Sequence, residues 1–222
     1  MVNWYLVIDL EMCRVPKGAR TKSYPWASEI IQIGAVLLSS NYKVVDKKSI
    51  YVKPQYGKLT RDIEKLTGIE QSQVYGEPYI QEAFEELVSW LPEGKIEVVT
   101  WSDSDYNQIA HELEGKDIHN SIIEELFNNY TDCQKIFGKR LGYERPYKLS
   151  EALVAAGIIA EGREHDGLDD AYNTAILFSK LKTEHNLILN PIFEEARKEE
   201  VQHLNYSIGS VFRELNLEAR TA

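Results

Sequence analysis

Residues 4–11 read Trp-Tyr-Leu-Val-Ile-Asp-Leu-Glu, an apolar run that closes with two acids, and this stretch decides the fold. The apolar side chains over residues 4–10 predict a short buried β-strand. Side chains two positions apart in a strand point to the same face, so Asp9 and Glu11 share one face. Two carboxylates about 5 Å apart repel each other by roughly 3 kcal/mol at an effective dielectric constant of about 20. Solvent, protons or a cation must offset that repulsion, unless the strand has ended and both acids lie in water.

The segments that follow this strand predict an α/β domain with a mixed central sheet flanked by helices. Apolar runs at residues 29–38 and 43–52 complete an antiparallel meander, and residues 96–101 predict a fourth strand. Helical apolar spacing with Gly and Pro stops predicts helices at residues 60–67, 78–91, 105–114, 121–141 (with a short strand near 130–132), 148–156 and 169–184. We assign residues 1–185 to this domain and residues 186–222 to a C-terminal helical extension. That extension either packs on the domain or forms a homodimer contact.

The composition excludes several classes of protein. The chain has 222 residues, 25 Lys and Arg against 35 Asp and Glu, and a net charge of −10. This charge argues against coating nucleic acid by bulk electrostatics, although a bound metal ion can reverse the local sign. Two cysteines, Cys13 and Cys133, make no disulfide framework. Because the sequence also shows no signal-peptide pattern and no apolar run long enough to span a bilayer, we expect a cytoplasmic protein without a membrane partner.

Acids also stand where the fourth predicted strand gives way to a helix. Residues 100–106 read Thr-Trp-Ser-Asp-Ser-Asp-Tyr, and strand ends are where sites collect in open α/β sheets. Asp103 and Asp105 are both natural helix caps. Capping explains one of these acids well and explains the pair less well, so one of the two is a candidate site residue.

A histidine and an aspartate mark the start of the last long helix. Residues 165–171 read His-Asp-Gly-Leu-Asp-Asp-Ala, so His165 precedes Asp170 by five positions. The loop lets the imidazole face a site while the helix holds Asp170 rigidly. The spacing is not that of an EF-hand, because the loop ligands and the closing Glu are missing. The alternative is a helix cap beside a surface histidine.

The combination of these stretches is more specific than any one of them. It supplies four carboxylates and one histidine: Asp9, Glu11, Asp105, Asp170 and His165. Oxygen ligands favour Mg²⁺ or Mn²⁺ over zinc, and four acids can hold two such ions. Two ions about 3.5–4 Å apart clamp an in-line phosphoryl displacement, one activating water and the other stabilising the leaving 3′ oxygen. A histidine imidazole can take the proton from that water at neutral pH.

These residues resemble the motifs of the DEDDh 3′→5′ exonucleases, which have a ribonuclease-H-like fold. Residues 7–11 (Val-Ile-Asp-Leu-Glu), 101–105 (Trp-Ser-Asp-Ser-Asp) and 165–170 are similar to the three exonuclease motifs, with histidine marking the subclass. Residues 29–36 and 66–69 match further segments, and the resemblance covers about residues 3–182. Within the family, the first and third motifs are most similar to those of exonucleases that trim small and structural RNAs. One departure is Ser104, where many members have an apolar or aromatic residue, so Asp103 competes with Asp105 and we favour Asp105.

The resemblance implies a two-metal-ion 3′→5′ exonuclease over residues 1–185, acting on single-stranded RNA or DNA 3′ ends and releasing nucleoside 5′-monophosphates. It implies Mg²⁺ or Mn²⁺ at Asp9, Glu11, Asp105 and Asp170, with His165 as the general base. The alternatives are a catalytically silent module that binds nucleic acid or protein, and a phosphohydrolase that acts on small nucleotides.

Contacts to the substrate are predicted from residues beside the motifs. Met12 and Cys13 stand where the family meets the terminal nucleotide, or they are ordinary packing residues. Two basic stretches are either phosphate tracks or solvated faces: Arg14, Lys17, Arg20 and Lys22, and then Lys135, Lys139, Arg140, Arg145 and Lys148. Tyr24 and Trp26 either stack on a base or are buried.

Overall fold

A computed structural model describes residues 2–128, 130–142, 145–191 and 193 of the chain. Within these residues, no helix is both long enough and apolar enough to cross a membrane. The part of the predicted C-terminal helical extension that follows residue 193, and the homodimer contact predicted for the extension, lie outside the described residues. The described part of the extension, up to residue 191, stays on the domain, because the Asn190 backbone N–H donates to the carbonyl of Ala155 at 2.9 Å.

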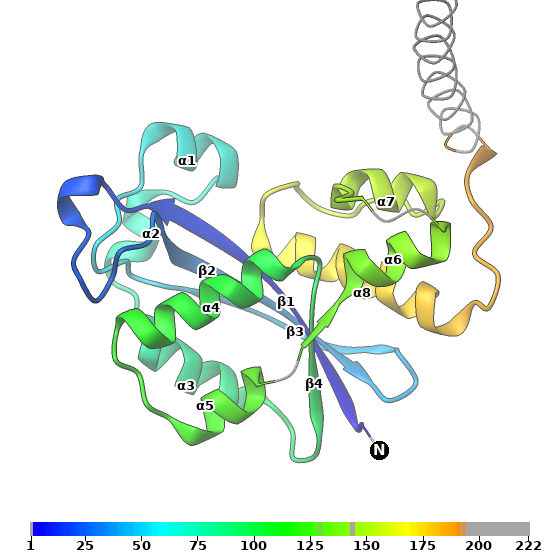
Figure 1. Ribbon diagram of the computed structural model, residues 1–222, viewed down its shortest axis with the longest axis horizontal. Coiled ribbons are helices and arrows are strands. Elements are labelled where there is room, and N and C mark those ends of the chain that lie inside the picture. The colour runs from blue at the N-terminus through cyan, green and yellow to red at the C-terminus, as the bar shows by residue number, and fades with distance from the viewer. Residues whose placement is uncertain (1, 129, 143–144, 192, 194–222) are drawn as a thin grey trace, which may run out of the picture.

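Five strands form one mixed sheet in the order β3-β2-β1-β4-β5 (Figure 1). The central strand β1 (Trp4–Arg14) pairs antiparallel with β2 (Ser28–Ser39) and parallel with β4 (Ile96–Thr100). β3 (Val44–Tyr51) lies antiparallel to β2, and β5 (Tyr130–Asp132) lies parallel to β4. The predicted α/β fold, with an antiparallel meander first and a mixed sheet, is confirmed.

Helices cover both faces of this sheet. The helical elements are η1 (Lys17–Ala19), α1 (Arg61–Thr67), α2 (Gln71–Tyr75), α3 (Ile80–Trp90), α4 (Asp103–Gly115), α5 (Ser121–Phe127), α6 (Cys133–Leu141), α7 (Leu149–Ala155) and α8 (Gly167–Thr183). In Figure 1, α3, α4 and α5 lie on one side of the sheet and α6, α7 and α8 on the other. Two apolar cores therefore form, one on each face.

The alternation of β1 decides which face carries the acids. Tyr5 and Val7 belong to the core beneath α6, α7 and α8, whereas Leu6 and Ile8 belong to the core beneath α3, α4 and α5. Asp9 continues the series of Tyr5 and Val7 along the strand. It therefore reaches the face of the sheet on which α8 packs.

β1 is longer than the sequence predicted. It continues to Arg14 because β2 pairs with it from Trp4 to Arg14, with a register shift between Glu11 and Met12. The alternative in which the strand has ended before its acids is thus wrong, since Asp9 and Glu11 are inside a paired strand. Residues 11–14, which follow the predicted strand, belong to β1.

Candidate active site

Two glycines bring the start of α8 against the central strands. An added Cβ at Gly34 would lie 2.0 Å from the carbonyl carbon and oxygen of Gly167, so no larger residue fits there without movement. The Gly167 N–H also donates to Oε1 of Gln32 at 2.9 Å. Because Gly34 is the pairing partner of Asp9 in the sheet, this close approach places the first turn of α8 beside Asp9.

The loop before α8 holds His165 next to Asp170. His165 has a φ of 65°, a left-handed conformation that is uncommon for a residue with a side chain. Its backbone N–H donates to Oδ2 of Asp170 at 2.9 Å, and Asp166 caps the helix by accepting from Leu168 and Asp169 N–H groups. Uncommon backbone conformations held by such contacts concentrate at functional sites.

Four acids and the histidine converge on one pocket of about 530 Å³ between β1, α4, α7 and α8. Its lining includes all five residues: Asp9, Glu11, Asp105, His165 and Asp170. Ligand atoms of Glu11, His165 and Asp170 lie within 4.8 Å of one another, a spacing suited to a single metal ion. Glu11 is buried, Asp170 is half-buried and His165 is exposed at the rim.

The acids of this cluster hold their protons more tightly than ordinary carboxyls do. Burial, followed by the charges of Asp170 and Asp105, raises the pKa of Glu11 to about 8. Burial raises the pKa of Asp105 to about 7 although backbone N–H groups of Leu10 and Asp105 stabilise its charge. Burial, then the neighbouring acids, raises the pKa of Asp9 well above its usual value. Such a set of crowded carboxylates fits a divalent cation, which would offset their mutual repulsion.

Asp103 and Asp105 lie in different surroundings. Asp105 is 5% exposed and lines the pocket. Asp103 is exposed at the surface, with a carboxylate oxygen 3.8 Å from Nζ of Lys135. The helix begins earlier than predicted, at Asp103, because the Ser102 hydroxyl caps it by accepting from the Ser104 N–H. Asp105 is thus the aspartate that faces the site.

The structure separates the three residues predicted to contact substrate. Met12 lines the active-site pocket. Cys13 is 1% exposed and packs in a small apolar cluster with Ile31, Ile69 and Val74, so its thiol faces the core. Arg14 is exposed and lines an adjoining pocket rather than this one.

Several residues that line the pocket were not among the predicted site residues. Asn173, 4% exposed, exchanges two hydrogen bonds of 2.9 Å with the backbone of Glu161 and so ties the loop before α8 to that helix. Gln134, Tyr147 and Lys148 also line the pocket. A polar residue on the apolar face of a helix, as at Asn173, is the signal that could have drawn attention to this loop.

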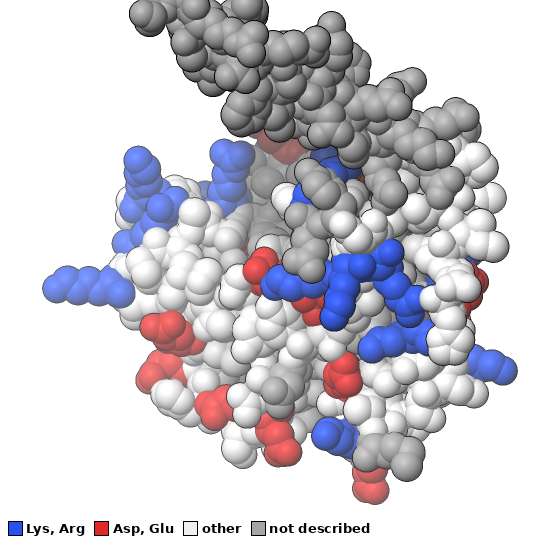
Figure 2. Space-filling model, turned by 45° about the vertical axis from the view of Figure 1, so that its right-hand side comes forward, with Lys and Arg blue, Asp and Glu red and all other residues white. Residues whose placement is uncertain are grey.

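Lys and Arg side chains gather on the face where α6 and α8 lie (Figure 2). Much of the second basic stretch is engaged within the protein. The Arg140 guanidinium donates to the carbonyls of Leu181, Glu184 and His185 at 2.6–3.2 Å and closes the end of α8. Lys135 pairs with Asp132 at 2.9 Å. Lys148, by contrast, is exposed at the wall of the active-site pocket.

Together, the mixed sheet, the acids of β1, the aspartate of α4 and the His–Asp pair of α8 define a DEDDh nuclease domain on a ribonuclease-H-like fold. The chain belongs to the exonuclease family, whose profile matches residues 6–178. The resemblance drawn from the motifs is thereby confirmed.

Several known exonucleases are similar to this chain. ERI1 exoribonuclease 2 of Homo sapiens is 31% identical over 206 residues, which cover 82% of this chain and 28% of the relative. The 3′-5′ exonuclease Snipper of Drosophila melanogaster is 28% identical over 201 residues, covering 81% of this chain and 69% of that protein. The nuclease domain of 3′hExo, a DEDDh family member bound to rAMP, has a TM-score of 0.67 at 21% identity and covers 85% of this chain and 96% of its own. The chain thus spans under a third of the length of the first relative.

Proposed function

We propose that this chain is a divalent-metal-dependent 3′→5′ exonuclease that releases nucleoside 5′-monophosphates from single-stranded RNA or DNA. The convergence of Asp9, Glu11, Asp105, Asp170 and His165 in one pocket carries this proposal. A pure binding module has no need of four crowded carboxylates whose charges oppose one another. Because the donors are mostly carboxylate oxygens, we propose two Mg²⁺ or Mn²⁺ ions as the cofactor.

The residues of the pocket have separate roles in the proposed hydrolysis. The four acids would hold the ions, which when bound polarise the phosphate and lower the pKa of water. His165, at the pocket rim, takes the proton from the attacking water. The new bond joins that water oxygen to phosphorus, and the bond from phosphorus to the 3′ oxygen of the preceding nucleotide breaks. That 3′ oxygen takes a proton from solvent, and the terminal nucleotide leaves as a 5′-monophosphate.

The pocket walls supply the contacts that hold the 3′ end. Met12 offers an apolar surface to the terminal nucleotide beside the acids of β1. Lys148 is the one Lys or Arg among the described residues that line the pocket. We infer that its ammonium group contacts a phosphate of the bound strand.

Digestion of matched RNA and DNA oligonucleotides labelled at the 5′ end tests this function. With Mg²⁺ or Mn²⁺, the labelled oligonucleotide should shorten by one nucleotide at a time, and a chelator should stop the reaction. Asp9→Ala and Asp170→Ala should abolish this activity without unfolding the protein, whereas exposed Asp103→Ala should retain it. Full activity in Asp9→Ala and Asp170→Ala would overturn the proposal. Oligonucleotide binding without any hydrolysis would favour the silent binding module instead.

His165 requires its own test, because it acts on protons rather than on metal. His165→Ala should lose most of the rate while metal still raises its melting temperature by mass action. A His165→Ala protein that keeps the wild-type rate in the digestion assay would contradict the role of His165 as the base.

A further inference from the structure

A second pocket of about 500 Å³ adjoins the active-site pocket, and Met12 and Ser104 line both. One wall of this second pocket is the α4 face that carries Ser104, Asn107 and His111, which are spaced to lie on one side of a helix. From Ser104 to His111 the helix rises by roughly 10 Å at 1.5 Å per residue. The second pocket thus forms a groove, the α4 groove, that leads away from the acid cluster along α4.

The chemistry of the α4 groove differs from that of the active site. No Asp or Glu stands among the described residues that line it, whereas acids from β1, α4, α8 and the loop before α8 line the active-site pocket. The rings of Trp26 and His111 stack in the groove, with centroids 4.5 Å apart and planes 20° apart. Arg14 lines the same groove, is exposed, and makes no ion pair with the described residues. A stacked ring pair beside an unpaired cation is the combination that binds single-stranded nucleic acid.

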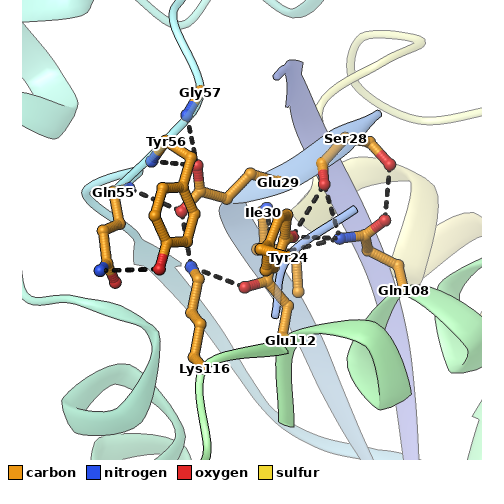
Figure 3. Close-up of polar contacts among 10 residues, drawn as sticks. All are labelled: Tyr24, Ser28, Glu29, Ile30, Gln55, Tyr56, Gly57, Gln108, Glu112 and Lys116. Carbon is orange, nitrogen blue, oxygen red and sulfur yellow. Dashed lines mark hydrogen bonds and ion pairs between the residues drawn. The ribbon is translucent and has the colours of Figure 1, made fainter. Parts of the chain in front are cut away.

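A buried ion-pair network surrounds Lys116 at the end of α4 (Figure 3). Lys116 Nζ lies 2.6 Å from Glu29 and 2.7 Å from Glu112, and both glutamates are fully buried. Glu29 also accepts hydrogen bonds from the backbone N–H groups of residues 55–57, and Glu112 accepts one from Ile30 at 2.8 Å. The network thus ties β2 and the loop after β3 to the end of α4.

The same helix holds the segment that carries Trp26. The hydroxyl of Tyr24, which is fully buried, donates to Glu112 or to the Ser28 carbonyl at 3.0 and 2.8 Å. The Ser28 hydroxyl donates to Gln108 at 2.6 Å. Trp26 therefore sits between two residues that are anchored to α4, and its ring is held over His111 before any ligand arrives. Groups positioned in advance bind with less loss of conformational entropy.

We propose that the α4 groove binds the nucleotide immediately upstream of the terminal one, with its base against the Trp26–His111 ring pair and a phosphate at Arg14. This inference rests on the proposed exonuclease function, since the strand must leave the acid cluster along some path. The groove is continuous with the active site through Met12 and Ser104, and it is free of the acids that would repel phosphates. Tyr24, also predicted to stack on a base, is buried and supports Trp26 instead.

Oligonucleotides with and without a base at the penultimate position test this inference. His111→Ala and Trp26→Ala should each lower kcat/KM on an ordinary single strand by roughly tenfold, the scale of one base–aromatic stack. The loss should vanish on a strand whose penultimate nucleotide is abasic, because that strand has nothing to stack. Trp26→Phe should restore most of the rate, since it keeps an aromatic face. Arg14→Gln should lower the rate on both strands, because the phosphate remains.

The outcomes distinguish a wrong inference about the α4 groove from a wrong assignment of the exonuclease function. Wild-type hydrolysis of a nitrophenyl ester of a nucleoside 5′-monophosphate, which has no upstream nucleotide, reports on the active site alone. If that hydrolysis is present and His111→Ala slows ordinary and abasic strands equally, the groove inference is wrong. His119→Ala, an exposed histidine outside the groove, is the matched control and should change neither rate. If Trp26→Ala does not fold, His111→Ala and Arg14→Gln still decide the question.

Discussion

Replacing Gly34 with alanine tests whether the contact between β2 and α8 positions the active site. The new Cβ would lie 2.0 Å from backbone atoms of Gly167, while ordinary contacts begin at 3.4 Å. Because both neighbouring atoms are backbone, no side chain can rotate away to make room. The first turn of α8 must therefore move by about 1.4 Å or more, and His165 and Asp170 move with it, while Asp9 stays on its strand.

The expected effect on catalysis is larger than the effect on stability. A misplacement of about 1 Å can cost on the order of 100-fold in rate, so we expect Gly34→Ala to lower kcat/KM by about that factor. Overpacking costs about 1–3 kcal/mol of unfolding free energy, which lowers the melting temperature of a domain of this size by roughly 2–12 °C. The two quantities are measured by oligonucleotide digestion and by circular dichroism during heating.

A matched control separates this effect from the general effect of adding a methyl group. An added Cβ at Gly76 meets nothing within 4 Å, and the φ of Gly76 is −93°, so Gly76→Ala should keep both rate and stability. The metal-induced rise in melting temperature should shrink in Gly34→Ala, because the acids no longer converge. Wild-type kcat/KM in a folded Gly34→Ala protein would refute the claim that this contact positions the site.

Three further predictions follow from particular groups. Asp105→Asn should lower kcat/KM at least 100-fold, because Asp105 lines the pocket. Asp103→Asn should stay within about twofold of the wild-type kcat/KM, because Asp103 lies outside the pocket and its surface ion pair contributes at most about 1 kcal/mol. Equal losses in the digestion assay would contradict the choice of Asp105 as the site residue. Burial raises the pKa of Glu11 to about 8 and that of Asp105 to about 7, so without metal the folded protein binds more protons than the unfolded chain. The free energy of unfolding should therefore fall as the pH rises from 5 to 8. Metal competes with those protons, so calorimetry should find that Mn²⁺ raises the melting temperature more at pH 8 than at pH 6, and equal shifts would argue against the cluster as the metal site. Lys116→Met should cost about 3–5 kcal/mol of unfolding free energy in urea, because two buried carboxylates lose their cation. Lys48→Met, which loses only a partly exposed surface pair, should cost under about 1 kcal/mol.

Local patterns were enough to predict which segments of the chain form the strands and most of the helices. The alternation along β1 correctly placed Asp9 and Glu11 on one face, because side-chain direction in a strand depends only on position. The length of β1 could not be read in the same way. The strand reaches Arg14 because β2 pairs with it across a register shift, and pairing is a property of two segments. α2 was missed, since five residues between loops carry too little periodicity to be recognised.

The site could be predicted only as far as residue type and motif order reach. The acids and His165 were named from their positions after strands and before helices, and all five line one pocket. The contact of Gly34 with Gly167 joins positions 133 apart in sequence, and no local pattern around either glycine predicts it. The bridge from Lys116 to Glu29 likewise spans 87 positions. Long-range contacts of this kind place the motifs, and no local pattern encodes them.

The distribution of charge explains how an acidic chain can take a polyanion to an acidic site. The net charge of −10 gives no general attraction for nucleic acid. The α4 groove, however, is lined by no acid among the described residues and has Arg14 exposed. At its inner end the crowded carboxylates fit divalent cations, which would convert a repulsive surface into one that accepts phosphate. On the proposed path, a strand would meet no acid of the described lining until it reached the acid cluster, where bound divalent cations would make the last step of binding favourable.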